Sequence, residues 1–312
     1  ALTSKGVKTE FVGYDLMTAQ SDILIMVKNN QEIKDADAGD DIELVTEKTP
    51  FYAESGGQAG DTGLITTGTC QIRVNDTMAD PTGLVIHKVT VESGSIKTGE
   101  TVTLLPDENN RNDTARNHTA THLLHSALRH VLGDHVKQAG SLVTPERLRF
   151  DFTHFSPATA DELTAIENEV NQRIRENHPV NTVEMTMDEA QKAGATALFE
   201  EKYGDKVRVV SQGDFSKELC GGTHTQRSGD IGLFCILSET GIASGVRRIE
   251  AVTGQAAIDH FHFTRSSVEQ AAGLLRGSKE DIVQKVDLLL KDKKALEKDL
   301  DSYRRAADFL NF

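Results

Sequence analysis

The chain has 312 residues, more than one typical domain, so two or three structural units are expected. Its longest strongly apolar run, Ile23 to Val27, is too short to cross a membrane, and no charged segment followed by an apolar stretch indicates a secretory signal. The net charge of −14 argues against a generally basic nucleic-acid-binding surface, but it leaves room for a local basic patch.

Three cysteines are present, an odd number without the spacing of a disulfide framework. This usage favours a reducing compartment, and we expect a cytoplasmic protein. Cys70 and Cys235 lie in alternating apolar segments and are predicted to be small core residues.

Residues 1–105 are predicted to form a small β-barrel domain. Apolar runs of alternating polarity, separated by Gly, Asn and Asp turns, recur at the intervals typical of such a barrel. These runs are Ile23–Val27, Asp41–Val45, Thr69–Val74, Leu84–Thr90 and Glu100–Leu105. The segment Phe51–Gly63 is rich in glycine, so its backbone could approach a phosphate or ribose; a wide turn of the barrel is the alternative.

Residues 106–255 are predicted to form a two-layer α+β domain. Asn112 or Asp113 is expected to cap a helix that ends at Leu132, because the next residue is a glycine. Apolar periodicity predicts two further helices and five strands. The helices are 157–176 and 188–193, and the strands are 140–143, 148–152, 207–211, 231–238 and 245–252.

Residues 256–312 are predicted to be one long helix. Four side chains recur every seven positions, which is the pattern of a coiled coil over about three heptads. They are Ile282, Leu289, Leu296 and Tyr303. Because the seam also carries Lys293 and is short, we expect a monomer. The first residue, Ala1, and a heptad pattern that continues to Phe312 favour a segment of a longer protein.

Two pairs of transition-metal ligands stand out in the central domain. His118 and His122 are four positions apart, which puts both side chains on one face of a helix. Cys220 and His224 have the same spacing, with two glycines that let a loop turn tightly between them. Three imidazoles and one thiolate suit zinc, so the four residues predict a Zn²⁺ site.

Two roles for this zinc remain open. Four bound ligands make a closed, structural tetrahedron, whereas the loss of one leaves a position for water or a substrate atom. Position 119 is Thr, where a HExxH metalloprotease has its Glu base, so that class is excluded. His125, one turn further along, is predicted either to support the metal ligands or face the substrate, or to be a solvated histidine.

Four motifs occur in the order found in one family. Asn117–His122, Glu218–His224, Phe51–Gly63 and Arg247–Ala251 together resemble the editing region of alanyl-tRNA synthetases of bacterial type. The resemblance covers the chain essentially end to end. Free-standing AlaX editing proteins and the editing domain of threonyl-tRNA synthetase share the metal motifs. The helical tail and the start without Met favour a synthetase segment that lacks the aminoacylation core.

This resemblance implies hydrolysis of Ser-tRNA(Ala) and Gly-tRNA(Ala), with tRNA(Ala) as the partner and no membrane. A pocket built for alanine cannot strongly reject glycine, and comparable sites reject an added hydroxyl by only about 100-fold, so a second, hydrolytic site is needed. Water is expected to attack the aminoacyl ester, assisted by a ribose hydroxyl because no acidic residue occupies an obvious position for a base. The intact protein is expected to oligomerise through an absent C-terminal domain.

The resemblance also implies roles for individual residues. The zinc ligands are His118, His122, Cys220 and His224. The catalytic set is Thr121, Gln138 and Cys220, in which Thr121 senses the serine side chain and Gln138 lines the editing pocket. The residues that contact the tRNA 3′ end are Gly56, Gly57, Gln58, Arg247 and Arg248, where phosphate contacts would position the strand.

Structural alternatives stand beside these roles. Thr121 could donate to the helix carbonyl of residue 117, Gln138 could be a capping amide, and one of the paired arginines could bind Glu250. The alternatives for the whole region are a tRNA-binding module with a structural zinc, a free-standing AlaX-type trans-editing protein, and a coiled-coil scaffold.

Overall fold

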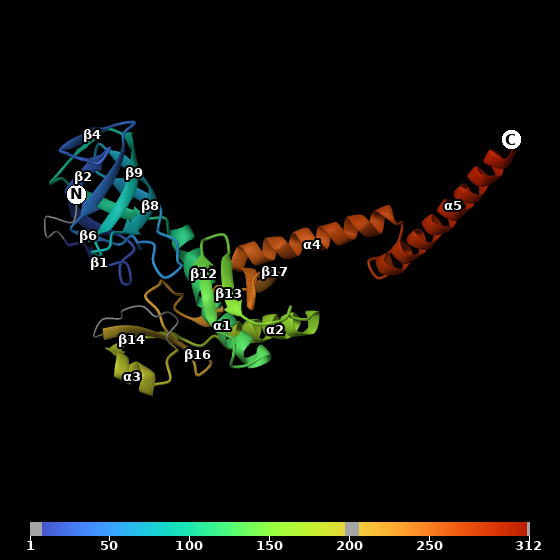
Figure 1. Cartoon of the computed structure of the whole chain (residues 1–312). Coiled ribbons are helices and arrows are strands. Elements are labelled where there is room, and N and C mark those ends of the chain that lie inside the picture. Colours follow the sequence, from blue (N-terminus) through green and yellow to red (C-terminus); the bar gives the residue numbers. More distant parts are fainter. Residues whose placement is uncertain (1–7, 197–205, 311–312) are drawn as a thin grey trace. The chain divides into compact units, whose positions relative to one another are not determined.

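A computed structural model describes residues 8–196 and 206–310 (Figure 1). The expected domain start at residue 1 and the chain end at Phe312 lie outside the described residues. The chain divides into two compact units, Ala1–Ala257 and Ile258–Phe312. None of the described helices is long and apolar enough to cross a membrane.

The predicted barrel is confirmed. Its six strands follow the order β11-β7-β8-β9-β5-β2, and antiparallel pairing of β2 with β11 closes the ring. They are β2 (Ala19–Lys28), β5 (Asp41–Thr46), β7 (Gly63–Thr66), β8 (Gln71–Ala79), β9 (Val85–Ser93) and β11 (Thr101–Pro106). Strand β7 was not predicted, since it is short and directly follows the glycine-rich segment. Alternate side chains such as Ile23, Leu44 and Ile72 fill the interior.

Shorter strands decorate the barrel. Strand β3 extends β2 at the edge, β1 pairs with β6 in parallel, and β4 pairs with β10. Their bounds are β1 (Glu10–Phe11), β3 (Gln31–Ile33), β4 (Asp35–Asp37), β6 (Lys48–Thr49) and β10 (Ser95–Lys97).

Helix α1 (Glu108–Leu132) follows β11 directly and leads into the central region. The predicted cap at Asn112 or Asp113 is wrong, because the Asp107 carboxylate accepts the N–H of Asn110 and starts the helix one turn earlier. The predicted C-terminal stop is confirmed, since the backbone N–H of Gly133 donates to the Arg129 carbonyl.

The central region contains two separate sheets. The first is antiparallel, in the order β12-β13-β18-β17, and α1 and α2 share its apolar core. Its elements are β12 (Gln138–Val143), β13 (Leu148–Thr153), α2 (Ala160–Glu176), β17 (Phe234–Ala243) and β18 (Val246–Thr253). This matches the predicted mixture of helix and strand packed in layers.

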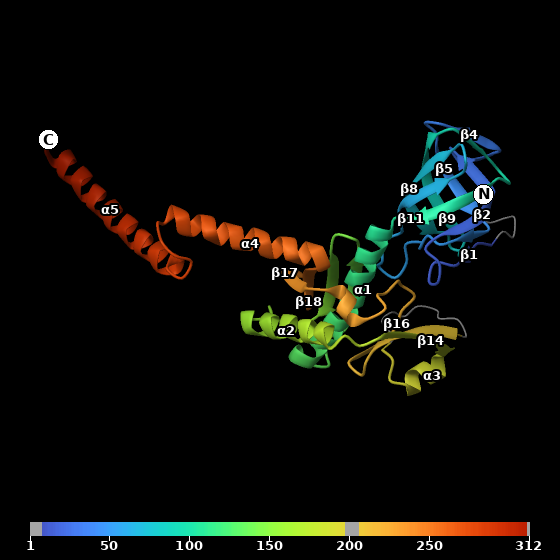
Figure 2. The same cartoon turned by 180° about the vertical axis from the view of Figure 1, so that it is seen from behind.

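The second sheet has the order β14-β15-β16 and its own small core with α3 (Figure 2). Its elements are β14 (Val180–Thr186), α3 (Met187–Lys192), β15 (Lys206–Gln212) and β16 (Ser216–Leu219). A single two-layer domain is therefore too simple a description. Strands β14 and β16 escaped prediction because β14 is mostly exposed and β16 is only four residues long. A short 3₁₀ helix, Ser228–Ile231, follows.

The prediction of one continuous C-terminal helix is wrong. The structure has two helices, α4 (Gly254–Leu274) and α5 (Ile282–Leu310). The first ends at Leu274; Arg276 follows with a left-handed φ of 49°, and the N–H of Gly277 donates to the Ala272 carbonyl. Ser278 then bonds the Asp281 carboxylate, so the chain is set to start a new helix.

Candidate metal centre and pocket

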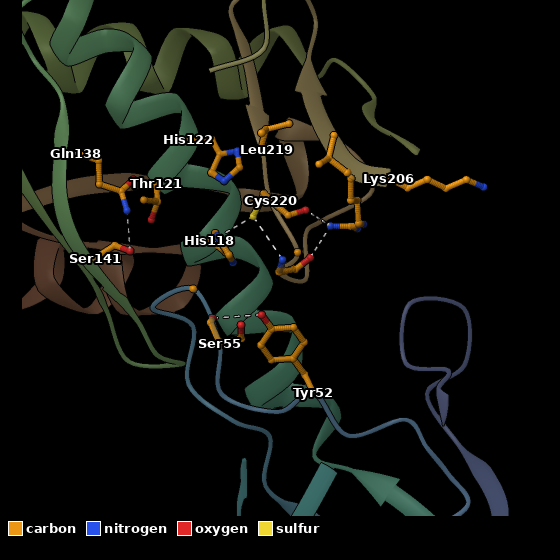
Figure 3. Close-up of a pocket in the computed structure, with 15 residues that line it drawn as sticks. Tyr52, Ser55, His118, Thr121, His122, Gln138, Ser141, Lys206, Leu219 and Cys220 are labelled. Carbon is orange, nitrogen blue, oxygen red and sulfur yellow. Dashed lines mark hydrogen bonds between the residues drawn. The ribbon is translucent and has the colours of Figure 1, made fainter. Parts of the chain in front are cut away.

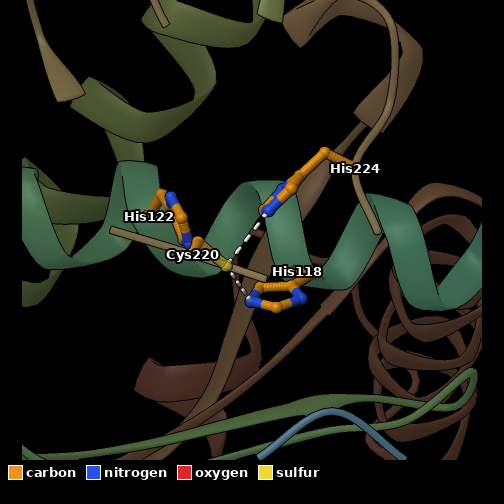
Figure 4. Close-up of side chains that lie close together, drawn as sticks. All are labelled: His118, His122, Cys220 and His224. Carbon is orange, nitrogen blue, oxygen red and sulfur yellow. Dashed lines mark hydrogen bonds between the residues drawn. The ribbon is translucent and has the colours of Figure 1, made fainter. Parts of the chain in front are cut away.

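Four side chains from two segments converge on one point (Figure 4). His118 and His122 project from α1, while Cys220 and His224 lie on the loop that follows β16. One ligand atom from each lies within 4.8 Å of the others, so the group could hold a metal ion. The Nε2 atoms of His118 and His224 both lie 3.3 Å from the Cys220 sulfur. The structure thus brings together all four predicted ligands.

The His118 ring is held by a residue of the barrel. Gln58 Oε1 lies 2.7 Å from His118 Nδ1 and 2.9 Å from the backbone nitrogen of Thr223. A backbone N–H can only donate, so the atom that it faces must be the amide oxygen. His118 Nδ1 therefore carries the proton, and its Nε2 presents a lone pair to the cluster.

The His224 ring is held by α1 itself. The Thr119 hydroxyl donates to the Ala115 carbonyl at 2.7 Å, so its oxygen is left to accept from other groups. It accepts the backbone N–H of Thr225 at 3.0 Å and faces His224 Nδ1 at 3.3 Å. His224 is therefore also protonated at Nδ1, with Nε2 directed at the sulfur.

A buried carboxylate stands behind the third imidazole. Glu218 Oε2 lies 3.5 Å from His122 Nδ1, and Oε1 accepts from His125 Nδ1 at 2.8 Å. His125 is only 3% exposed and does not line the pocket described below, so it is neither solvated nor substrate-facing. Its bond to Glu218, which faces His122, agrees with the prediction that it supports the metal ligands. Carboxylates in this position fix the ring of a metal-binding histidine and increase its basicity.

The charges of the cluster favour a cation. Burial works to raise the pKa of Cys220, but His118, His224 and His122 outweigh it and hold that pKa well below its usual range. Burial lowers the pKa of His224 to about 3, which leaves its imidazole neutral. Burial also works to lower the pKa of His122, yet Glu218 and Cys220 raise it to about 9. The cluster thus combines a thiolate with a histidine that a buried carboxylate helps to keep protonated, and a metal cation would replace that proton.

A cavity of about 240 Å³ opens on two of the histidines and the thiolate (Figure 3). The barrel, α1, β12 and the β15–β16 region all contribute to its wall. Six of the residues predicted for function line this cavity: Gly56, His118, Thr121, His122, Gln138 and Cys220. The wall also contains residues that were not predicted, namely Tyr52, Ser55, Ser141, Lys206 and Arg208.

Thr121 and Gln138 take well-defined positions in this wall. The Thr121 hydroxyl donates to the Asn117 carbonyl at 2.8 Å, as the structural alternative predicted, and the residue still lines the cavity. Gln138 caps no helix; it begins β12, and its Nε2 donates to Ser141 Oγ at 3.2 Å. Figure 3 shows both side chains on the wall opposite Lys206.

The glycine-rich loop packs against the protein at Gly57 and Gln58, while Gly56 is exposed and lines the cavity. Gly57 has a φ of 84°, and an added Cβ would lie 2.5 Å from Ser141 Oγ. Its carbonyl accepts the N–H of Val143 at 2.7 Å, which ties the loop to β12. The Gln58 side chain is completely buried beneath it. Gly57 and Gln58 are therefore not presented to a ligand from solvent.

The two adjacent arginines lie on β18, outside the cavity. Arg247 binds the Glu239 carboxylate through Nε and Nη2, at 2.5 and 2.7 Å. Arg248 binds Asp151 in the same two-pronged manner, at 2.7 and 2.8 Å. The predicted partner Glu250 is wrong, since it pairs with Arg147. Contact of these arginines with tRNA stays a prediction.

Arg208 on β15 supports the ligand loop. Its Nη1 donates to the carbonyls of Cys220 and Gly222, at 3.0 and 2.8 Å. Its guanidinium carbon lies 4.2 Å from the centroid of the Tyr14 ring, and the Tyr14 hydroxyl donates to the Gly221 carbonyl. An arginine in a strand gives no sequence signal for such a role, because the contacts depend on where the loop folds.

Comparisons with known proteins agree with this architecture. Residues 1–110 match the family of class II (A) tRNA synthetases, and residues 207–250 match the second additional domain of threonyl and alanyl tRNA synthetases. The alanine–tRNA ligase of Desulfosudis oleivorans is 55% identical over 299 residues, which are 96% of this chain and 34% of that protein.

The alanine–tRNA ligases of Acetivibrio thermocellus and Stenotrophomonas maltophilia are 48% and 49% identical, over 96% and 95% of this chain and 34% of each relative. The chain thus spans about a third of the length of the curated relatives that it matches. Over nearly all its residues, the chain is therefore homologous to a segment of alanine–tRNA ligases.

Proposed function

We propose that this segment hydrolyses mischarged tRNA(Ala), releasing serine or glycine, as the editing part of an alanine–tRNA ligase. The observation that carries the proposal is the cavity of about 240 Å³ that joins a half-buried thiolate and two buried histidines to the polar side chains of Thr121 and Gln138. The match of residues 207–250 to a domain shared by threonyl and alanyl tRNA synthetases supports it. A cavity this small suits a small aminoacyl group.

We further propose that the cluster holds zinc. Three imidazole nitrogens and one thiolate are the donor set of His/Cys zinc sites, and the outer partners of the imidazoles fit that assignment. When bound, zinc would polarise the ester carbonyl or lower the pKa of a bound water.

The chain's own residues would bind and orient the ester. Gln138 is held by Ser141, and its amide oxygen is free to accept a hydrogen bond from the α-amino group of the substrate. Thr121 borders the space for the serine side chain. Lys206 and Arg208 add positive charge to the cavity wall, where a phosphate of the tRNA 3′ end would bind.

Hydrolysis breaks the bond between the acyl carbon and the ribose oxygen, together with one O–H bond of water. The oxygen of water bonds to the acyl carbon, a proton from that water goes to the leaving ribose oxygen, and the amino acid and tRNA separate. Among the described residues that line the cavity there is no Asp or Glu to act as a base. The neighbouring hydroxyl of the terminal ribose is therefore the group that we assign to assist proton transfer.

A tRNA-binding module with a structural metal is the second candidate. It is favoured by the mutual approach of all four ligand atoms, which suits a closed tetrahedron. A free-standing trans-editing protein receives less support, because the relatives that match nearly all of this chain are about three times longer than it.

Release of serine from Ser-tRNA(Ala) separates these candidates. We expect the chain to deacylate Ser-tRNA(Ala) and to leave Ala-tRNA(Ala) largely intact. Cys220→Ala should abolish the reaction, and Gln138→Ala should reduce it while the metal content stays unchanged. Cys235→Ala, outside the cavity, is the matched control. Full activity in a metal-free Cys220→Ala protein would refute the catalytic site, and metal binding without any deacylation would favour the binding module.

A further inference from the structure

One residue of the barrel is built into the metal centre. Gln58 is completely buried, and all of its side-chain hydrogen bonds go to His118 and to Thr223 in the ligand loop. We infer that Gln58 is a positioning residue that fixes the tautomer of His118 and joins both ligand pairs. The inference deepens the proposed function, because it concerns the same site, but it requires only that the cluster binds a metal.

Gln58 fixes His118 through its amide oxygen, and the hydrogen bonds around the amide distinguish this oxygen from the amide nitrogen. The backbone N–H of Thr223 selects the amide oxygen, so the second partner of that oxygen, His118 Nδ1, must be a donor. The imidazole is then held with its unprotonated Nε2 towards the Cys220 sulfur, 3.3 Å away. A metal ligand needs this lone pair, so the tautomer is prepared before a metal arrives.

The other end of the amide holds the loop that carries the second ligand pair. Gln58 Nε2 donates to Thr223 Oγ1 at 2.9 Å, and Thr223 lies between Cys220 and His224. A single side chain from the barrel therefore contacts both ligand pairs: it bonds His118 on α1, and it bonds the loop that carries Cys220 and His224. Gly222 makes this approach feasible, because a Cβ there would lie 2.0 Å from His118 Cε1 and 2.8 Å from Gln58 Oε1.

The glycines of the loop explain how Gln58 reaches this place. Ser55 and Gln58 exchange both backbone hydrogen bonds, at 2.9 and 3.2 Å, across a two-residue turn. Gly56 and Gly57 occupy that turn with φ of 58° and 84°, which glycine adopts at least cost. The glycine-rich motif thus serves to present Gln58 to the metal centre, whether or not the loop also meets a ligand.

Removal of the acceptor should weaken metal binding. Without Gln58 Oε1, two donors, His118 Nδ1 and the Thr223 N–H, remain buried without a partner. Loss of such an outer contact to a metal-binding histidine typically lowers metal affinity by about 10- to 100-fold. A carboxylate at the same position keeps the acceptor, and the Thr223 hydroxyl can turn to donate to it.

The test compares two variants. Gln58→Met keeps the length of the side chain but has no comparable hydrogen-bond acceptor, whereas Gln58→Glu keeps an acceptor oxygen. Affinity of the whole chain for Zn²⁺ and Co²⁺ is measured by competition with a chelator. We expect Gln58→Met to bind about 10- to 100-fold more weakly and Gln58→Glu to stay within about threefold of the parent. Gln71→Met is the matched control, because Gln71 bonds Glu92 on the barrel surface.

Two further readouts distinguish positioning from a general loss of structure. The ¹⁵N signals of His118 in the metal-free chain should report an Nδ1–H tautomer in the parent and in Gln58→Glu, and a mixture in Gln58→Met. The Co²⁺ absorption spectrum should change in Gln58→Met alone. Parent affinity and spectrum in Gln58→Met would overturn the inference, as would an equal loss in Gln58→Glu. Deacylation of Ser-tRNA(Ala) is measured separately, so its absence in a metal-binding parent would count against the proposed function only.

Discussion

Asp61 in the barrel and Arg111 in α1 form a buried ion pair that fastens the two parts together. Arg111 Nε lies 3.0 and 2.9 Å from the two carboxylate oxygens of Asp61, and both side chains are at most 6% exposed. Arg111 also donates to the carbonyls of Gly13 and Pro50, while Asp61 accepts the N–H of Tyr52. This network sets where the barrel's glycine-rich loop begins relative to the histidines of α1.

Asp61→Asn should therefore destabilise the protein by about 3–5 kcal/mol, because it leaves the Arg111 charge buried without its counterion. The free energy of unfolding in urea measures the loss. A double substitution, Asp61→Asn with Arg111→Gln, should cost less than the sum of the two single changes, because each single change leaves one buried charge unpaired whereas the double variant leaves none. Strict additivity would show that the pair is not coupled.

Glu218 should matter for the metal rather than for the fold. Glu218→Gln removes the charge that raises the pKa of His122 but keeps the size of the side chain. We expect the affinity for Zn²⁺ to fall by about 10- to 100-fold, as seen for outer carboxylates of other zinc sites. Chelator competition measures the affinity. Glu184→Gln, on the exposed part of β14 in the same sheet, should leave it unchanged.

Adjacent glycines offer a closely matched comparison in the ligand loop. A Cβ at Gly222 would lie 2.0 Å from His118 Cε1 and 2.3 Å from Nδ1, so Gly222→Ala must displace the imidazole or the loop. At Gly221 the nearest atom would be the Tyr14 hydroxyl, 4.0 Å away. We expect Gly222→Ala to lower Zn²⁺ affinity more than 10-fold, and Gly221→Ala to have little effect. Equal affinities would contradict the close packing at Gly222.

The ligands were predictable because their chemistry is local. His118 and His122 share a helix face, and Cys220 and His224 share a glycine-containing loop, so each pair carries its own signal in the spacing. The barrel was predictable for a similar reason, since alternation along each strand shows which side chains fill the interior.

The outer partners were not predictable from the sequence. Gln58, Glu218 and Arg208 are ordinary polar residues whose roles depend on contacts between segments far apart in the chain. The sequence predicts Gln58 to contact tRNA, because a glycine-rich loop indicates backbone freedom but not the direction in which a side chain points.

The break between α4 and α5 was missed although its signal is local. Gly277 is a signal for the end of one helix, and Ser278 followed by Asp281 is a signal for the start of the next. The heptad repeat of the following residues outweighed that signal in the prediction of one helix.

A buried histidine makes the barrel sensitive to acid. His87 is fully buried; its Nδ1 donates to the Leu44 carbonyl at 3.0 Å, and its Nε2 accepts from the Thr49 hydroxyl at 2.8 Å. That hydroxyl oxygen in turn accepts the Phe51 N–H, at the start of the glycine-rich segment. Burial lowers the pKa of His87 from 6.5 to about 4, so the folded barrel holds the neutral ring.

Because the pKa is lower in the folded state, the unfolded chain binds more protons at His87 between pH 6.5 and pH 4. The free energy of unfolding should therefore be unaffected by His87 above pH 6.5 and should fall as the pH drops towards 4, by up to about 3 kcal/mol.

Urea unfolding at pH 7 and pH 4.5, followed in the parent and in His87→Gln, measures this contribution. The variant should be less stable at pH 7, since its hydrogen bonds are rebuilt imperfectly, but its stability should fall less on acidification. The substitution His262→Gln at an exposed histidine of α4 controls for the general effect of acid. An identical pH dependence in the parent and in His87→Gln would show that the barrel tolerates a charged ring at this position.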